Sequence, residues 1–277
     1  MLYLGGFAIG MVYSKLDSAG SNMAAQIAAQ NGFERVEGER YLRYRNDEIH
    51  IYESDVLPFQ ADFADTLGCS VIMFLSRHKS EADVDAFTTH SLGNWRNSSD
   101  FGGKPKQLST AAPELMLFAL AGISKIDENV QKTYEATHHG PLLKTPSLFV
   151  ELGGSERMLD SKPIAAKVAD AAFASLTSML EGTTSARRIV IGIGSNHYPQ
   201  KFTKLALTKG YAFSHILPKY AILNEDGSNN LDVLEQAMGR SSPEPESAVI
   251  DWKSLNSAMK EETIKKLNEI GLDNEKV

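Results

Sequence analysis

The stretch Ile189-Val190-Ile191-Gly192-Ile193 decides the fold class, because a short and wholly apolar run of this kind is typical of a buried strand. Gly194 and a loop that carries His197 follow it, and a helical pattern then runs to about Lys209. The residues from Tyr211 to Ile216 predict one more strand. A strand, a loop, a helix and another strand in this order indicate an α/β fold with a largely parallel sheet.

The same alternation of strands and helices extends over the rest of the chain. The expected strands are Phe7 to Tyr13, Val71 to Leu75, Lys132 to Thr137, Leu148 to Leu152 and Ala248 to Trp252. The expected helices are one through Met23 and Ala28, then Ala112 to Ile123, Ile164 to Leu180 and Met259 to Ile270. Tyr41 to Tyr44 and Ile49 to Tyr52 flank Asn46-Asp47 and predict a hairpin, and Ser241 to Glu246 is the best candidate for an exposed loop.

Composition limits the class of protein. The 277 residues are 42% hydrophobic and 23% charged, which is ordinary globular composition and predicts a single α/β domain over 1–277. No apolar run reaches the roughly 18 residues that a membrane span requires, and no signal peptide is visible, so a cytoplasmic protein without a membrane partner is expected. The net charge of −7 argues against a protein that coats nucleic acid, although it leaves room for a small RNA footprint.

Chemistry is indicated by where the histidines stand. His78, His139 and His197 each follow a predicted strand, His138 lies beside them, and Glu151 ends a fourth strand. Because ligands of α/β sheets bind beyond the carboxyl ends of the strands, we expect these side chains to converge there. Imidazole and carboxylate suit zinc, which lowers the pKa of bound water to about 7. None of the spacings forms a compact zinc motif, so the pattern alone does not specify a metal.

Each histidine also has a structural interpretation. An isolated histidine is more often a hydrogen-bonded structural residue than a ligand, and we assign His50 in the hairpin to that class, with His90 and His215 left open. Strand geometry would point the neighbours His138 and His139 to opposite faces, unless the strand has already ended, as the following glycine and proline suggest.

Six motifs carry a resemblance to a known family. They are Ser76-Arg77-His78-Lys79-Ser80-Glu81, Thr89-His90-x-x-Gly93-Asn94, Glu135-Ala136-Thr137-His138-His139-Gly140-Pro141, Val150-Glu151-Leu152-Gly153-Gly154-Ser155-Glu156, Gly194-x-x-His197-Tyr198-x-x-Lys201-Phe202-Thr203 and His215-Ile216-Leu217-Pro218-Lys219-Tyr220. In type and order they resemble the motifs of archaeal and plant D-aminoacyl-tRNA deacylases. The chain departs from that pattern at Leu92 and in the turn around Ser18, where the family usually has proline. Residues 221–277 match only loosely.

The resemblance implies a three-layer phosphorylase/hydrolase-like fold with a central mixed, largely parallel sheet, dependence on zinc, and hydrolysis of the ester at the 3′ end of D-aminoacyl-tRNA by a monomer. The catalytic residues it implies are His78, His138, His139, Glu151 and His197, of which His78, His139, Glu151 and His197 are the candidate zinc ligands. The implied substrate and tRNA contacts are Arg77, His90, Asn94, Gly153, Gly154, Ser155, Gly194, Tyr198, Lys201, Thr203 and Lys219. Among these, the glycine turns offer backbone amides to an oxyanion or to the terminal adenosine, the cations face phosphates, and Tyr198 stacks on a base.

Rival functions use the same residue types. A zinc amidohydrolase or carboxypeptidase-like enzyme would direct the histidines and the glutamate at a peptide, and a nucleoside phosphorylase-like enzyme would act on a free nucleoside. A tRNA-binding module without activity is the third alternative, against which the sequence pI of about 5.6 argues.

Overall fold

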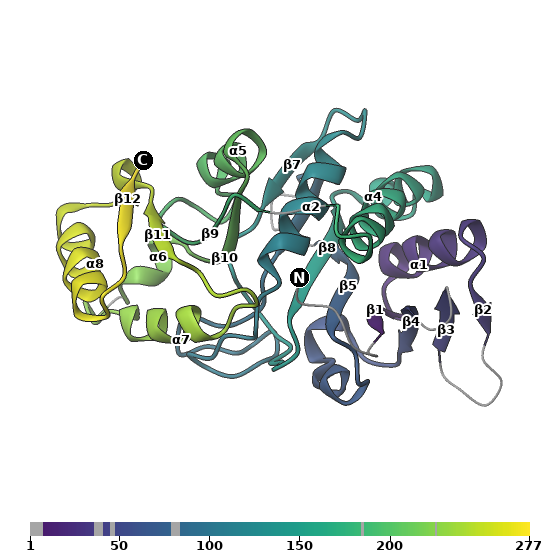
Figure 1. Cartoon of the computed structure of the whole chain (residues 1–277), viewed down its shortest axis with the longest axis horizontal. Coiled ribbons are helices and arrows are strands. Elements are labelled where there is room, and N and C mark those ends of the chain that lie inside the picture. Colours follow the sequence, from purple (N-terminus) through teal and green to yellow (C-terminus); the bar gives the residue numbers. More distant parts are fainter. Residues whose placement is uncertain (1–7, 36–40, 45–47, 79–83, 184–185, 225) are drawn as a thin grey trace.

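The chain folds into two β-sheets that lie side by side, with helices packed against them (Figure 1). The computed structural model describes residues 8–35, 41–44, 48–78, 84–183, 186–224 and 226–277. The larger sheet has the strand order β2 (Glu34–Arg35), β3 (Tyr41–Tyr44), β4 (Ile49–Ser54), β1 (Ile9–Ser14), β5 (Val71–His78), β8 (Ser147–Gly153), β6 (Ala86–His90) and β7 (Gln131–Tyr134). The smaller sheet has the order β10 (Tyr211–Leu217), β9 (Arg188–Ile193), β11 (Ser247–Ile250) and β12 (Asn274–Lys276).

The helices connect these strands. In chain order they are α1 (Ser18–Gln30), α2 (Pro113–Ser124), α3 (Glu156–Leu159), α4 (Lys162–Leu180), α5 (Gln200–Lys209), α6 (Lys219–Ile222), α7 (Leu234–Gly239) and α8 (Ser257–Glu269). Four short 3-10 helices accompany them, namely η1 (Pro58–Gln60), η2 (Asp62–Thr66), η3 (Leu231–Val233) and η4 (Trp252–Ser254). No helix among the described residues has the length and apolar character needed to cross a membrane.

Strand direction confirms the predicted α/β class with a mixed, mostly parallel sheet. The strands β4, β1, β5 and β8 are parallel to one another, whereas β6 runs antiparallel to β8. All pairs in the smaller sheet are parallel. The strands divide between two sheets instead of forming one central sheet, because apolar periodicity identifies a strand but does not choose its partner. The prediction of a single domain stays a prediction.

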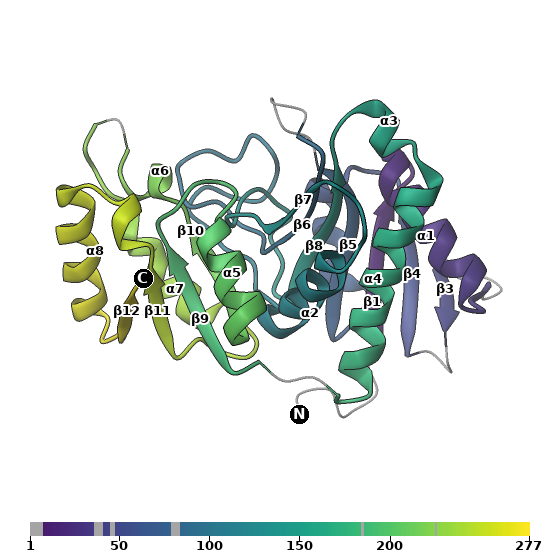
Figure 2. The same ribbon diagram turned by 90° about the horizontal axis from the view of Figure 1, so that it is seen from above.

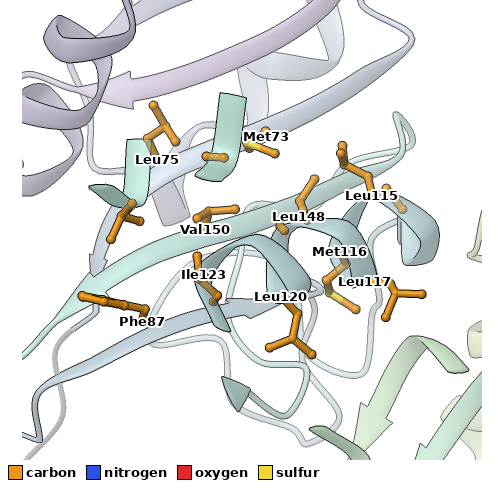
Figure 3. Packing of buried hydrophobic residues seen from close by; sticks show 14 of the residues in the cluster. Met73, Leu75, Phe87, Leu115, Met116, Leu117, Leu120, Ile123, Leu148 and Val150 are labelled. Carbon is orange, nitrogen blue, oxygen red and sulfur yellow. The ribbon is translucent and has the colours of Figure 1, made fainter. Parts of the chain in front are cut away.

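One face of the larger sheet is covered by α1, α4 and α2 (Figure 2). In α2 the buried residues Met116, Leu120 and Ile123 recur at helical spacing and belong to the same core as Leu148 and Val150 of β8 (Figure 3). Side chains alternate along a strand, so the residues between those of β8 and β5 face the other way. There the rings of Phe74 and Phe149 stack with centroids 4.8 Å apart. The second face also packs against other residues, because Phe74 and Phe149 share a buried core with Ala61, Ala64 and Leu143, and the site lies next to this core.

A buried carboxylate joins the start of α1 to the end of β5. Asp17, 1% exposed, is the N-cap of α1, and its side chain accepts a hydrogen bond from the amide of Gly20. Its second oxygen accepts from the hydroxyl of Ser76 at 3.1 Å and from the amide of Arg77 at 2.7 Å. Asp17 therefore fixes the last residues of β5 as well as capping a helix.

The sequence predictions were wrong in several places. The expected strand from Lys132 to Thr137 ends at Tyr134, because Ala136 and Thr137 donate their amides to carbonyls of the smaller sheet's loops and strands. The expected exposed loop at Ser241 to Glu246 is partly buried, since Ser241 forms a bridge with Ala111 and is 6% exposed.

Other differences concern elements and their limits. The strands β6 and β12 were not predicted, and β11 ends at Ile250 before Trp252. The hairpin of β3 and β4 is confirmed as antiparallel, while its turn residues Asn46 and Asp47 lie outside the described residues, as does Phe7 at the start of the first expected strand.

His215 and His50 are structural. The Nδ1 atom of His215 lies 3.3 Å from the hydroxyl of Thr137, and its Nε2 lies 2.8 Å from the carbonyl oxygen of Arg240. Burial lowers the pKa of His215 to about 4. His50 is buried with its Nδ1 2.9 Å from the hydroxyl of Tyr52. The prediction for His50 is confirmed in this respect.

We predict that Asp17→Ala lowers the free energy of unfolding by about 3 kcal/mol, because it removes a helix cap and leaves two donors at the end of β5 without their acceptor. The matched control is Asn256→Ala, which removes an N-cap whose side chain accepts from a single amide, that of Met259, and which should cost about 1 kcal/mol. Urea denaturation of the three proteins measures the difference, and equal losses would contradict the bridging role of Asp17.

We further predict that His215 makes the protein less stable in acid. Its folded pKa is below the ordinary value of 6.5, so the unfolded chain takes up the proton first. The stability is therefore complete above pH 6.5 and falls by about 1.4 kcal/mol per pH unit as the pH drops towards 4. In His215→Gln the slope of unfolding free energy against pH should be shallower by about one proton over this range. Parallel slopes for the two proteins would refute the prediction.

Candidate active site

The site begins on the face of β5 and β8 that lies opposite to α1, α2 and α4. Ser76 pairs with Glu151 and His78 with Gly153, so Glu151 and His78 project from the same face as the stacked pair Phe74 and Phe149. Gly153 leaves room for the histidine, because a Cβ at this position would lie 2.9 Å from the Cβ of His78. The predicted loop position of His78 is corrected, since it is the last residue of β5.

The segment after β7 brings two further histidines to this face. The amide of Ala136 donates to the carbonyl oxygen of His197, and that of Thr137 to Ile216. The strand has ended by this point, and His139 has a φ of +44°. The rings of His138 and His139 therefore come together, with centroids 4.3 Å apart, instead of pointing to opposite faces.

Glu135 is the centre of the arrangement. Its carboxylate is 1% exposed, and one oxygen lies 2.9 Å from Nε2 of His197 and 3.6 Å from Nε2 of His138. The other oxygen lies 3.2 Å from Nδ1 of His78. One buried carboxylate thus faces three imidazoles that come from three separate parts of the chain.

Glu151 forms a second buried carboxylate beside the first. Its Oε2 atom lies 3.3 Å from Nδ1 of His78 and 3.7 Å from Nε2 of His90. The His90 ring, at the end of the antiparallel strand β6, stacks on Phe149 with centroids 5.1 Å apart and planes at 4°. We call the seven residues His78, His90, Glu135, His138, His139, Glu151 and His197 the histidine–glutamate cluster.

Three rings of the cluster are oriented in the same way. The Nδ1 atoms of His90, His138 and His139 lie 2.7 to 3.0 Å from the backbone carbonyl oxygens of Ser91, Ala136 and Gly140 respectively. A carbonyl can only accept, so each Nδ1 carries a proton, and wherever the ring is neutral its Nε2 keeps a lone pair. Histidine ligands of metals are commonly held in this way.

The charges are divided within the cluster. Burial works to raise the pKa of both glutamates, but Glu135 receives the hydrogen bond of His197 and Glu151 that of His78, and the pKa values of both carboxyls are lowered. Burial works against the charged form of His78, yet its hydrogen bond to Glu151 and the charge of Glu135 raise its pKa to about 9. His78 therefore balances part of the negative charge at neutral pH.

His138 and His139 are neutral at neutral pH. Burial, reinforced by the charge of His90, lowers the pKa of His139 to about 4. The same causes hold the pKa of His138 well below its ordinary range. Two imidazoles with available lone pairs thus stand next to two ionised carboxylates.

These residues could hold a metal ion. Three groups within the cluster have their ligand atoms within 4.8 Å of one another, namely His90 with His138 and His139, His78 with Glu135 and His197, and His90 with Glu135 and Glu151. Nε2 of His90 and Oε1 of Glu135 are buried without a hydrogen-bond partner. Buried polar atoms are ordinarily paired, so two such atoms at one place fit a site that a cation completes.

Other residues expected at the site lie around the cluster. The hydroxyl of Tyr198 is 2.6 Å from Nε2 of His78, and Nδ1 of His197 is 3.2 Å from the hydroxyl of Tyr220. Lys219 begins α6 next to Tyr220 and is half-buried. Arg77 is exposed and, by the alternation of β5, projects from the face opposite to that of His78.

Several predicted substrate contacts have their polar groups engaged within the protein. Asn94 donates to Gly102 and Lys104 carbonyls, the Ser155 amide that follows Gly154 donates to Asp85, and the Gly194 amide donates to the carbonyl of Leu217. Lys201 forms an ion pair with Asp251. The buried Thr203 hydroxyl lies 2.9 Å from that of Thr133. These contacts give each of the five residues a structural task.

Sequence reasoning missed Glu135 and Tyr220 as site residues, although both lie within the quoted motifs. Glu135 shares with Glu151 only its place near the end of a strand, because β7 has the sequence Gln-Lys-Thr-Tyr and is not apolar, and the predicted strand continued to Thr137. His90 was assigned to substrate, whereas its ring lies wholly buried inside the cluster.

Comparisons with known proteins identify the family of this chain. A family model described as D-aminoacyl-tRNA deacylase matches residues 66–275. The D-aminoacyl-tRNA deacylase of Pyrococcus furiosus is 32% identical over 94% of this chain and 96% of its own length. That of Ignicoccus hospitalis is 36% identical over 78% of this chain and 86% of its own. The solved structure of a conserved protein of unknown function, AF0625, is 29% identical and superposes with a TM-score of 0.84 over 99% of this chain and 96% of that one. The chain belongs to the D-aminoacyl-tRNA deacylase family.

Proposed function

We propose that the protein hydrolyses the ester between a D-amino acid and the 3′ end of tRNA, and that the histidine–glutamate cluster performs the reaction. The observation that supports this assignment is the convergence of two ionised carboxylates and two neutral imidazoles at one buried place. Family membership favours this reaction over the peptidase-like and nucleoside phosphorylase-like alternatives.

Zinc is the metal that we propose for the cluster. Nitrogen and carboxylate oxygen donors suit it, and either of two groups could hold an ion, namely His90 with His138 and His139, or His78 with Glu135 and His197. Glu151 would complete the negative charge of the site from beside His78 and His90. When bound, zinc supplies a Lewis acid that makes water a stronger nucleophile at neutral pH.

The residues of the chain orient and receive protons. If zinc is held by His78, Glu135 and His197, Nε2 of His139 keeps a lone pair directed away from the carbonyl of Gly140, and this atom can accept a proton from the attacking water. Glu135 and Tyr220 hold the two nitrogens of His197, which fixes the plane of that ring. If zinc is held instead by His90, His138 and His139, the positive charge of His78 keeps both glutamates ionised without exposing them to solvent.

Other residues predicted from the sequence are proposed to contact the 3′ end of the tRNA. We propose that Lys219, at the start of α6, faces a phosphate of the RNA and that Tyr198 lies beside the substrate, because its hydroxyl contacts His78. Arg77 is left out of this proposal because it projects from the opposite face of the sheet. We also propose that the protein acts in the cytoplasm as a monomer, where charged tRNA is its substrate.

We predict that the protein releases D-tyrosine from D-tyrosyl-tRNA and leaves L-tyrosyl-tRNA largely charged. His139→Ala should slow the single-turnover rate by about 100-fold or more, because the proton acceptor or metal ligand is removed. His50→Gln is the matched control, since it changes a buried histidine of the hairpin and should lower stability by about 1 kcal/mol while sparing the rate.

Thermal melts of both variants separate loss of function from loss of fold. A normal rate in His139→Ala would remove that residue from the reaction. Equal hydrolysis of the D and L substrates by the unchanged protein would refute the proposed selectivity, and an absence of hydrolysis of either would refute the proposed activity.

We also predict that purified protein contains zinc and that a chelator removes both the metal and the activity, which added zinc restores. His90→Ala should lower the zinc content because it removes a buried donor without a hydrogen-bond partner, whereas His50→Ala should not. Elemental analysis after gel filtration measures the metal directly. Full activity in demonstrably metal-free protein would exclude zinc from the reaction.

A further inference from the structure

The loop from Asn94 to Gln107 is tied to the active site by its backbone. The amide of Gly93, just before it, donates to the carbonyl oxygen of His139 at 2.7 Å. The amide of Gly140 donates to the carbonyl oxygen of Phe101 at 2.9 Å. The ends of the loop are also joined, because the amide of Asn94 donates to Gln107. The middle of the loop therefore lies directly beside the residue that follows His139.

Glycines make this contact close. Gly102 has a φ of +75°, and a Cβ there would lie 1.9 Å from the carbonyl oxygen of Phe59. A Cβ at Gly140 would lie 2.3 Å from the amide nitrogen of Gly103. Backbone packs on backbone at both positions, so neither residue tolerates a side chain without moving the loop. These close backbone contacts of Gly102 and Gly140 fix the position of Phe101 relative to the cluster.

Phe101 is an exposed aromatic residue in this tightly held loop. Its side chain is 65% exposed, the highest value among the large hydrophobic residues with marked exposure in the described part of the chain. The ring of Phe59 supports it edge-on, with centroids 6.0 Å apart and planes at 88°. Phe59 in turn lies 6.2 Å from the ring of His139. Two successive ring contacts thus connect His139 of the cluster with the exposed ring of Phe101.

Cations accompany this ring. Arg96 and Lys104 are exposed in the same loop, and within the described residues neither forms an ion pair. Lys106 is engaged with Asp232, and Asp100 accepts a hydrogen bond from Ser98. The loop therefore carries an exposed apolar ring and two exposed positive side chains, which is the combination that binds single-stranded nucleic acid.

We propose that Phe101 is the stacking platform for the terminal adenine of the tRNA substrate. This inference rests on the proposed function. The adenine is attached to the ribose that carries the amino acid, so it must lie within one nucleoside of the ester, and Phe101 lies two ring contacts from His139. Arg96 and Lys104, exposed in the same loop, are then the cations available to the phosphates of the preceding nucleotides.

The exposure of the ring favours a base over the amino-acid side chain as the occupant. A pocket that discriminates side chains must surround them, whereas a base can be stacked from one side with solvent on the other. The outward position of Phe101 and the cations beside it match the second kind of contact.

The test compares two esters of D-tyrosine, one on adenosine 5′-phosphate and one on the same ribose phosphate without a base. Phe101→Leu should reduce kcat/KM for the adenosine ester by about 10-fold, mostly through KM, because stacking on one aromatic ring contributes this order of affinity. Phe101→Trp should retain the rate of the unchanged protein. On the ester without a base, Phe101→Leu and the unchanged protein should be equal. Phe63→Leu, the same substitution at a phenylalanine 38% exposed on η2, is the matched control and should leave both rates unchanged.

A loss in Phe101→Leu that persists on the ester without a base would place the ring against the amino acid and overturn the proposal. An unchanged rate on the adenosine ester, or an equal loss in Phe63→Leu, would also overturn it. Activity of the unchanged protein on D-tyrosyl-tRNA is measured in the same series, so a failure of the stacking proposal is distinguished from a failure of the proposed function.

Discussion

The buried carboxylate of Glu135 is the constraint on which the arrangement of the site depends. An ionised carboxylate taken out of water costs several kcal/mol unless charged or hydrogen-bonding partners replace the solvent. His78 at the end of β5, His138 after β7 and His197 after β9 supply these partners at 2.9 to 3.6 Å. The larger sheet must therefore meet the loops of the smaller sheet at this point, and the amides of Ala136 and Thr137 complete that junction with backbone hydrogen bonds.

The larger sheet separates packing from chemistry by strand alternation alone. Met73, Leu75, Leu148 and Val150 face the helices and belong to the main core, while the residues between them turn to the other face. On that face an aromatic layer of Phe74 and Phe149 lies beneath His90 and beside Glu151. This layer of Phe74 and Phe149 limits the access of water to the carboxylates from the side of the sheet. Because β6 runs antiparallel to β8, its last residue, His90, pairs with Phe149 and comes close to Glu151.

The ends of the predicted strands identify part of this site. The same reasoning explains why the other site residues were not predicted. His78, Glu151 and His197 follow apolar runs that are unmistakable in sequence, and parallel strands bring their ends to one edge. Glu135 lies where a run of β-compatible residues continues, and only tertiary hydrogen bonds to the smaller sheet end the strand at Tyr134. The strand that carries His90 contains two threonines and little apolar periodicity. Lys201 and Thr203 lie on an amphipathic helix whose pattern cannot show that Asp251 and Thr133 are their partners.

Under the proposed function the enzyme distinguishes two nearly identical substrates, and its net charge of −7 adds no general affinity for the RNA that both share. D- and L-aminoacyl-tRNA share the whole RNA body, so affinity for phosphates is the same for both and adds nothing to their discrimination. Binding that is equal in the ground state and the transition state also leaves kcat unchanged. Contacts confined to the last nucleotide and its ester avoid affinity that both substrates share and binding that does not change kcat. Phe101 and the cations of its loop stand next to the histidine–glutamate cluster. They place the recognition energy within one nucleoside of the bond that is broken, where a difference in chirality can change the rate.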